Sequence, residues 1–405
     1  MARILFLTQV LPFPLSTGAK ARQYYVLRYL SQKHSVTLVS FVRPDDKPEY
    51  IAHLRSFCAE VHTVPMLRSR WRDVRSIALG LLRSQPIVIV RDAIEPMQTL
   101  IDRLLALEHY DAIHADQVSM AQYGLQGNNL RRVLDLHNAL YLVMKRLADN
   151  EPNPIKRLAA RREARALAYY EADLCRKYDQ VVFVTDEDRR AIEHRLTDYG
   201  IQVPADRFCT IPICVDTNEK RPVAPVANPQ RVTALGVMFW PPNSEGALWF
   251  ARQVWPRVHA QFPQARFTVV GKNPPPELNQ LNGVDNIEVA GYVPDLDAIL
   301  AETAVFIVPL RAGGGMRVKI VDGWSWGLPI VSTRIGAEGI TLRNRENILI
   351  ADSAETFGQA VMQVLSDPAL AKTLRQNGRH WVEEKYDWSR VYTAWDQVYD
   401  KLLTS

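Results

Sequence analysis

The sequence lacks the features of several protein classes. It contains four cysteines among 405 residues, at Cys58, Cys175, Cys209 and Cys214. These are scattered and form no Cys-x-x-Cys pair, which argues against a disulfide framework and against a zinc site. The longest apolar stretches, such as Ala304–Leu310 and Pro86–Val90, are far shorter than the ~18 to 20 residues of a membrane span. Pro12 and Pro14 interrupt the apolar run near the start, so no signal peptide is predicted. We expect a cytoplasmic protein with reduced cysteines.

The composition is that of an ordinary globular protein. Hydrophobic residues make up 47% of the chain and charged residues 23%, which excludes intrinsic disorder. The length favours roughly two to three domains.

Positive charge is concentrated in the first half of the chain. The net charge is +5, and residues 1–210 carry 30 basic and 24 acidic side chains. Two stretches, Arg68–Arg83 and Lys145–Arg165, each have a net charge of +4. They are either solvated helix faces or surfaces attracted to anionic lipid headgroups. Apolar residues accompany the first stretch at Trp71, Ile77, Leu79, Leu81 and Leu82. They favour a peripheral membrane contact. Nucleic acid is not an expected partner, because neither stretch carries a recognised binding motif.

Short apolar runs alternate with helical patterns along the whole chain. In the first half the runs that predict strands are Arg3–Thr8, Ser35–Phe41, Ala112–His114, Arg132–Leu136 and Gln180–Val184. After a Pro-rich and Ala-rich stretch, they are Val232–Leu235, Ala265–Val270, Ile287–Ala290, Val305–Leu310, Pro329–Thr333 and Asn347–Ile350. Such alternation predicts right-handed βαβ units in parallel sheets. We therefore expect an α/β protein with two doubly wound domains, and a ligand in the cleft between them.

The segment with the most chemistry follows the strand near Val305. Gly313, Gly314 and Gly315 precede Arg317, Lys319 and a predicted helix through Trp326. Glycines let backbone N–H groups approach an anion, and a helix start adds a favourable dipole. The pattern predicts a phosphate cradle, although a plain strand-to-helix turn would look similar. It completes neither the dinucleotide fingerprint nor the P-loop motif.

Residues 311–340, RAGGGMRVKIVDGWSWGLPIVSTRIGAEGI, resemble the donor-binding segment of family 4 nucleotide-sugar glycosyltransferases with the GT-B fold. Further similar segments, in the same order, are LFLTQVLPFPLSTGAKAR at the start, VLDLHNAL (133–140), VVFVTDEDR (181–189), TIPICVDT (210–217), MFWPPNSEGALWF (238–250), FTVVGKNPPPEL (267–278), GYVPDLDAIL (291–300) and WSRVYTAWDQVY near the end. The resemblance spans nearly the whole chain.

The resemblance implies roles for individual residues. Gly313, Gly314, Gly315, Arg317 and Lys319 would surround the donor diphosphate, Asp322 would bind ribose hydroxyls, Tyr292 and Val293 would lie near the nucleobase, and the Gly18 backbone would approach the diphosphate. His137 would lie beside the reacting sugar, where it would form hydrogen bonds rather than act as the nucleophile. Asp116 is an acceptor-side candidate, with a surface helix cap as the alternative. Arg317, Lys319 and His137 are therefore the candidate catalytic residues.

Two departures from the family pattern affect this site. The acidic residue expected eight positions before Asp322 is replaced by Gly314, and the segment GVMFWPPN lacks the Arg and the Lys that the family often has there. The donor sugar therefore cannot be inherited from the family. We expect Arg317 and Lys319 to supply the missing neutralisation, since charge-assisted hydrogen bonds are worth about 1.5–3 kcal/mol.

Asp295 and Asp297 form a formal Asp-x-Asp pair, the metal-diphosphate motif of the other glycosyltransferase fold. We interpret it as the start of a helix, where Asp is a favourable cap. No metal and no cofactor are therefore expected, and the leaving diphosphate would be stabilised by the helix dipole, the loop amides and two cations.

Together these expectations describe a retaining, metal-independent glycosyltransferase. It would use a nucleotide diphosphate sugar and a saccharide or lipid-linked saccharide acceptor in cell-surface or exopolysaccharide synthesis, and it would lie peripherally on the inner membrane face. The predicted domains are 1–217, a linker at 218–230, 231–385, and a helix at 386–405 that returns to the first domain. The alternatives are a nucleotide-sugar epimerase and a catalytically degenerate nucleotide-binding or glycan-binding protein.

Overall fold

The computed structural model describes residues 1–66, 69–127 and 130–404. Arg68, the first residue of the first basic stretch, lies outside the described residues. Among the described helices, none combines the length and the apolar composition that crossing a membrane requires.

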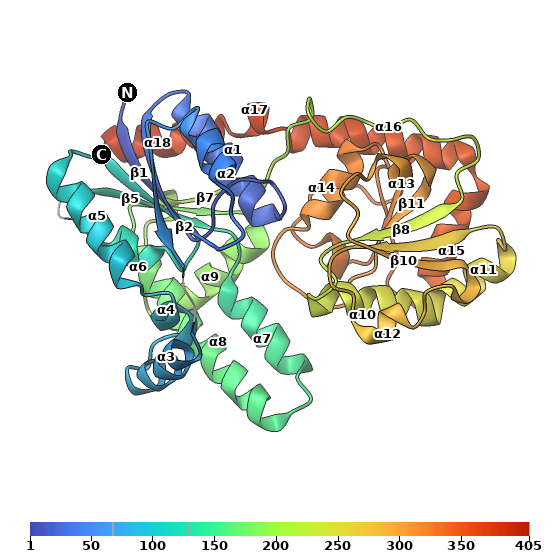
Figure 1. Ribbon diagram of the computed structural model, residues 1–405, viewed down its shortest axis with the longest axis horizontal. Coiled ribbons are helices and arrows are strands. Elements are labelled where there is room, and N and C mark those ends of the chain that lie inside the picture. The colour runs from blue at the N-terminus through green and yellow to red at the C-terminus, as the bar shows by residue number, and fades with distance from the viewer. Residues whose placement is uncertain (67–68, 128–129, 405) are drawn as a thin grey trace. The chain divides into compact units, whose positions relative to one another are not determined.

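The chain forms two compact units, each with one parallel sheet and surrounding helices (Figure 1). The first unit comprises Met1–Cys214 and Trp388–Ser405, and the second comprises Val215–Asp387. Two α/β units with parallel sheets confirm the predicted fold class.

The sheet of the first unit has seven strands within the described residues, in the order β3-β2-β1-β4-β5-β6-β7. They are β1 (Arg3–Thr8), β2 (Ser35–Val42), β3 (Glu60–Pro65), β4 (Ala112–Asp116), β5 (Arg131–Leu136), β6 (Gln180–Phe183) and β7 (Phe208–Thr210). Leu5 and Leu7 of β1 belong to one hydrophobic core, and Ile4 and Phe6 belong to another. Because successive side chains point to opposite faces, this strand is apolar throughout and buried on both sides.

Most of the helices described in the first unit precede strand β6. The helices before β6 are α1 (Gly18–Ser31), α2 (Pro48–Arg55), α3 (Arg70–Leu82), α4 (Ile87–Arg91), α5 (Glu95–Leu107), α6 (Ala121–Gly124), α7 (Leu140–Asn150) and α8 (Pro154–Lys177). Those after β6 are α9 (Asp186–Asp198), the short η1 (Ala205–Arg207), and the C-terminal α17 (Trp388–Val391) and α18 (Ala394–Thr404).

The C-terminal helices pack into the first unit. Trp395 and Tyr399 are buried in the same core as Ile4 and Phe6, and the Tyr399 hydroxyl lies 2.9 Å from Nδ1 of His114 on β4. The amphipathic end of the chain thus returns to the sheet in which the chain began.

The sheet of the second unit has six strands within the described part of the chain, in the order β10-β9-β8-β11-β12-β13. They are β8 (Arg231–Leu235), β9 (Arg266–Val270), β10 (Ile287–Gly291), β11 (Thr303–Val308), β12 (Ile330–Ser332) and β13 (Leu349–Ile350). The helices are α10 (Pro241–Trp249), η2 (Phe250–Val254), α11 (Trp255–Gln261), α12 (Pro276–Asn279), η3 (Val284–Asn286), α13 (Asp297–Glu302), α14 (Val318–Ser325), η4 (Ile335–Ala337), α15 (Ala354–Ser366) and α16 (Pro368–Lys385). All paired strands are parallel, so their carboxyl ends lie along one edge of the sheet.

Candidate functional site

The glycine-rich turn joins β11 to α14 in the second unit. Gly313 has a φ of 133° and Gly315 a φ of 73°, conformations in which a side chain would be strained. The turn runs directly into the first residue of α14, Val318. The first N–H groups of a helix have no partner within the helix, so this end attracts an anion.

Lys319 lies in the first turn of α14 and reaches toward the neighbouring strand β8. Its Nζ donates a hydrogen bond to Oδ1 of Asn243 on α10, at 2.8 Å. The residue as a whole is partly buried, but its ammonium group is enclosed. Burial and the charge of Arg317 lower the pKa of Lys319 to about 7, although Asp322 acts in the opposite direction. An anion bound here would restore the charge of the lysine.

Arg317 folds back onto the glycine-rich turn. Its Nη1 donates to the carbonyl oxygen of Gly314 at 2.5 Å, and its Nη2 lies 3.8 Å from Oε2 of Glu338. A Cβ on Gly313 would lie 2.7 Å from the same guanidinium nitrogen. In this structure Arg317 therefore braces the turn that it was predicted to assist.

Asp322 forms an ion pair that the sequence did not reveal. Its Oδ1 accepts a hydrogen bond from Nζ of Lys220, and the same Nζ lies 5.6 Å from the ring centroid of Trp326. The expected ribose-binding carboxylate is thus already partnered by a lysine 102 positions earlier in the chain.

Lys220 belongs to the segment that precedes β8, and contacts with α16 hold this segment in place. Arg379 of α16 donates to the carbonyl oxygens of Thr217 and Lys220, both at 2.8 Å, and Val223 N donates to the carbonyl oxygen of Trp326 at 3.0 Å. The predicted linker at 218–230 is therefore fastened along the second unit.

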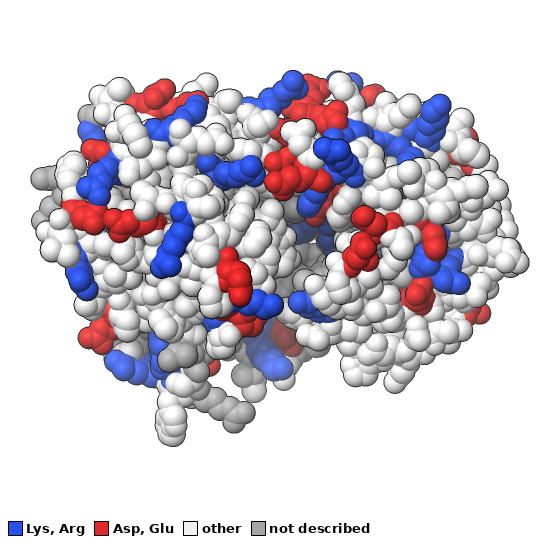
Figure 2. All heavy atoms as spheres, turned by 45° about the horizontal axis from the view of Figure 1, so that its top comes forward, with Lys and Arg blue, Asp and Glu red and all other residues white. Residues whose placement is uncertain are grey.

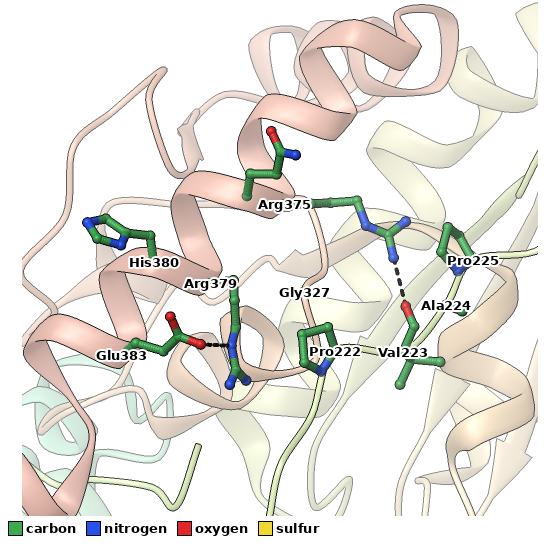
Figure 3. Close-up of a pocket in the computed structure, with 10 residues that line it drawn as sticks. Pro222, Val223, Ala224, Pro225, Gly327, Arg375, Arg379, His380 and Glu383 are labelled. Atoms are coloured by element: carbon green, nitrogen blue, oxygen red, sulfur yellow. Dashed lines mark hydrogen bonds and ion pairs between the residues drawn. The ribbon is translucent and has the colours of Figure 1, made fainter. Parts of the chain in front are cut away.

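A pocket of about 500 Å³ lies between this segment and α16, lined among others by Pro222 and Gly327 (Figure 3). Arg375 donates to the Val223 carbonyl oxygen at 3.0 Å, and Arg379 forms an ion pair with Glu383. Because both guanidinium groups are engaged and no residue of the glycine-rich turn lines the pocket, we interpret it as a clamp rather than as the donor site.

The loop after β10 carries Tyr292 and Val293. Tyr292 is 61% exposed, and Nζ of Lys272, after β9, lies 4.3 Å from its ring centroid. Further along, Oδ1 of Asp295 accepts a hydrogen bond from the Asp297 backbone N at 3.0 Å. The residue at the cap of α13 is Leu296, which forms no side-chain capping bond. The predicted Asp cap is therefore wrong, and the Asp295 bond closes a turn just before the helix.

The loops of the second unit converge at the carboxyl edge of its sheet. Gly236 N donates to the Val270 carbonyl oxygen, and Met238 N donates to the Lys272 carbonyl oxygen, both at 3.0 Å. A Cβ on Gly271 would lie 1.6 Å from the Gly236 carbonyl oxygen, so only glycine permits this approach. The edge therefore brings the lysine and asparagine pair, the glycine-rich turn and the Tyr292 loop to one side of the unit.

A second cluster lies at the carboxyl edge of the first sheet. Asp116 and Asp135 are paired in register on β4 and β5, and His137 follows β5. His137 Nε2 lies 2.8 Å from Oδ1 of Asp116, and its Nδ1 lies 3.2 Å from Gln117 Nε2. Asp116 is fully buried and also accepts a hydrogen bond from Gln23 Nε2 at 2.6 Å. It can therefore orient His137.

Arg22 of α1 completes this cluster and was missed from the sequence. It is fully buried and binds Asp135 with two nitrogens, Nε at 2.9 Å from Oδ2 and Nη2 at 2.8 Å from Oδ1. Burial alone would raise the pKa of Asp135, but Arg22 and His137 hold it below its usual value. Burial raises the pKa of Asp116, against the opposing effects of His137 and Gln23.

The side chains of Asp116, Asp135 and His137 are also close enough to bind a metal ion, with ligand atoms within 4.8 Å of one another. The atoms that would bind the metal already have partners, however, because Arg22 forms an ion pair with Asp135 and His137 lies within hydrogen-bond distance of Asp116. We interpret the cluster as an ion-pair network that holds the imidazole.

Gly18 is the first residue of α1, the helix that delivers Arg22 and Gln23 to this cluster. The side chain of Thr17 caps the helix by accepting a hydrogen bond from the Lys20 backbone N at 3.3 Å. The sequence predicts a helix that starts near Gly18 and includes Arg22. It does not reveal that Arg22 pairs with Asp135, which lies 113 positions later in the chain.

Comparisons with known proteins agree with these features. The profile of the family described as "Glycosyl transferases group 1" matches residues 229–367. A Klebsiella pneumoniae relative, described as an uncharacterized 44.6 kDa protein in the cps region, is 21% identical over 97% of this chain and 99% of its own length. The lipopolysaccharide core biosynthesis glycosyltransferase LpsE of Rhizobium meliloti is 27% identical, but over only 28% of this chain and 33% of its own length.

The crystal structure of Anabaena HepE in complex with UDP and glucose is similar over 99% of this chain and 100% of that chain, with a TM-score of 0.68. Its sequence identity of 14% makes this a likeness of fold.

Proposed function

Since the chain is a glycosyltransferase of group 1 with the GT-B fold, we propose that it transfers a sugar, with retention of configuration and without a metal ion, from a nucleotide diphosphate sugar to a hydroxyl group of a saccharide or lipid-linked saccharide. The relatives support this class of reaction. One is named for lipopolysaccharide core synthesis, and another is named for a cps region. We therefore propose a role in the synthesis of a cell-surface or exported polysaccharide.

The observation that carries the proposal is the enclosed ammonium group of Lys319 at the start of α14. When the bond between the sugar and the diphosphate breaks, negative charge grows on the departing phosphate oxygen. A preorganised cation and the positive end of the α14 helix dipole would stabilise that charge in a site with little water. Asn243 would hold Lys319 in the same position before and after donor binding.

We propose that a second contribution comes from the first unit. His137 would form a hydrogen bond to the donor sugar or to the acceptor, and Asp116 would orient its ring. Asp116 is enclosed, so it would act through His137 and not by contact with the acceptor. Replacing His137 with Ala should lower kcat/KM by about 10- to 100-fold, the loss of one hydrogen bond to a charged or reacting group, while binding of the free nucleotide should change little.

Donor identity is approached most directly with UDP-sugars, because the HepE structures contain UDP, UDP with glucose, and UDP-glucose. Purified protein would be screened by thermal shift against nucleoside diphosphates and their sugars, and a ligand at 100 times its Kd should stabilise the protein by ~2.7 kcal/mol. Hydrolysis or transfer of the stabilising donor would then be followed by product analysis. Absence of both reactions with a bound donor would contradict the proposal.

A degenerate nucleotide-binding protein is the second candidate. It is favoured by Gly314, which stands where the family has a carboxylate, and by the Lys220 partner that already occupies Asp322. Tight nucleotide binding without turnover of any common donor would favour this candidate. We also propose that the protein works in the cytoplasm at the inner face of a membrane, because the excess of basic residues lies in the first half of the chain.

A further inference from the structure

Helix α3 exposes most of its large apolar side chains. Trp71 is 85% exposed and Leu82 is 82% exposed. Ser76 and Gly80, by contrast, are buried. Val74, Ile77 and Leu81 are exposed as well. Positions 71, 74, 78 and 81 share one helical face, so a water-facing apolar stripe runs along the helix.

The orientation of α3 is fixed by its inner side. A Cβ on Gly80 would lie 3.0 Å from Cγ1 of Ile87, so a larger residue could not turn inward there. Arg162 of α8 donates to the carbonyl oxygens of Gly80 at 2.5 Å and of Gln85 at 3.0 Å. The apolar stripe therefore cannot be buried by rotating the helix in place.

The first turns of α8 continue the exposed apolar surface. Ile155 is 78% exposed and Leu158 is 70% exposed. They are seven and four positions before Arg162, which puts all three on one face of the helix. Because Arg162 contacts the end of α3, both apolar groups lie on the side of α8 that meets α3. We call these exposed residues of α3 and α8 the apolar face.

Basic side chains accompany the apolar face. Arg75 is exposed on α3, Arg83 is exposed directly after it, and Lys156 and Arg161 are exposed on α8. The acidic side chains nearby are fewer: Asp73 is exposed on α3, and Asp149 pairs with Arg161 at 3.6 Å. Figure 2 shows a face of the molecule on which both signs are interspersed. Exposed apolar residues with flanking cations are the composition of a helix that lies in a membrane interface.

We propose that the apolar face of α3 and α8 docks onto an anionic lipid bilayer, with Trp71 and Leu82 inserted among the headgroups. This identifies the surface for the membrane position proposed above, but it does not depend on glycosyl transfer. Attraction of the basic side chains to an anionic surface supports a lipid partner. A second copy of the chain would bring like charges together, which disfavours self-association.

The test measures binding of the purified full-length protein to vesicles of phosphatidylcholine alone or mixed with phosphatidylglycerol. We expect sedimentation with the anionic vesicles, weakened by raising the salt from 0.1 to 0.5 M. The double variant Trp71→Ser, Leu82→Ser should bind about 10- to 100-fold more weakly. Leu107→Ser, which alters an exposed leucine of α5 outside the apolar face, is the matched control and should bind normally.

Three results would overturn the proposal: no binding to anionic vesicles, equal binding to neutral and anionic vesicles, or equal loss in the Leu107→Ser control. A dimer in light scattering that disappears in the double variant would identify a second copy as the occupant instead. Unchanged melting temperatures would show that the variants fold. Turnover of a water-soluble acceptor should be the same in the double variant, which separates failure of docking from failure of the proposed activity.

Discussion

Replacing Lys319 with Ala removes an enclosed cation without removing a structural ion pair. Its described hydrogen bond goes to the neutral Asn243 side chain, so the folded state loses little, whereas a bound diphosphate loses a charge-assisted hydrogen bond. Such a bond is worth about 1.5–3 kcal/mol, which corresponds to roughly a 10- to 150-fold lower kcat/KM. The assay is donor turnover at substrate concentrations below KM. Lys372→Ala, an exposed lysine on α16, serves as the control.

The pKa of Lys319 gives the same prediction an independent signature. The donor-free protein holds this pKa at about 7, and a diphosphate binds the protonated form better, so binding must raise the pKa. Above pH 7 the lysine must take up a proton when the donor binds, and the Kd should rise by up to about tenfold per pH unit. Below pH 7 the lysine is already charged and its effect on the Kd should level off. A nucleotide sugar is the appropriate probe, since its diphosphate does not titrate in this range.

Calorimetry of donor binding between pH 6 and pH 9 would measure this dependence in the parent protein and in Lys319→Ala. The variant should show a flat profile. Turnover equal to that of the parent, or a Kd that does not change with pH in the parent, would refute the assignment of Lys319 to the diphosphate.

Three further results are expected. Asp322→Asn should weaken binding of a ribonucleoside diphosphate about tenfold and leave the 2′,3′-dideoxy analogue unaffected; equal losses for both, by calorimetry, would contradict a ribose contact. EDTA should leave turnover nearly intact, whereas complete loss restored by Mn²⁺ would point to metal binding, either at the Asp116 cluster or at Asp295. Arg22→Met should lower the free energy of unfolding by about 3–5 kcal/mol, because it leaves Asp135 buried without its ion-pair partner; urea unfolding measures this, and a loss below 1 kcal/mol would show that Asp135 is solvated.

The sequence predicts the central strands of both sheets well and misses two strands of the first sheet. Both missed strands, β3 (Glu60–Pro65) and β7 (Phe208–Thr210), lie at its edges. An edge strand has a neighbour on one side only and is less enclosed, so its sequence carries fewer apolar residues. The central strand β1 matches its predicted range in full, because burial on both faces leaves a continuous apolar run.

The partners of the candidate site residues were beyond prediction for a different reason. Residue type and local spacing point to Lys319 and His137, but Asn243 lies 76 positions from Lys319 and Arg22 lies 113 positions from Asp135. Only the register of neighbouring strands and the helix that follows each strand bring such pairs together. Full burial of Asp116 is likewise a property of the packed sheet and of α1.

The second departure from the family pattern has a physical account in Asn243. The segment after β8 lacks the two cations that the family often has there, yet it supplies the amide oxygen that holds Lys319 at the same edge of the sheet. Lys319 of α14 thus supplies the positive charge, and Asn243 of α10 orients it. A cation positioned by a neutral amide binds an anion better than one paired with a carboxylate, because no ion pair must break first. By the same reasoning Asp322 is the weaker part of the site, because a ribose hydroxyl must compete with Lys220 for its carboxylate oxygens.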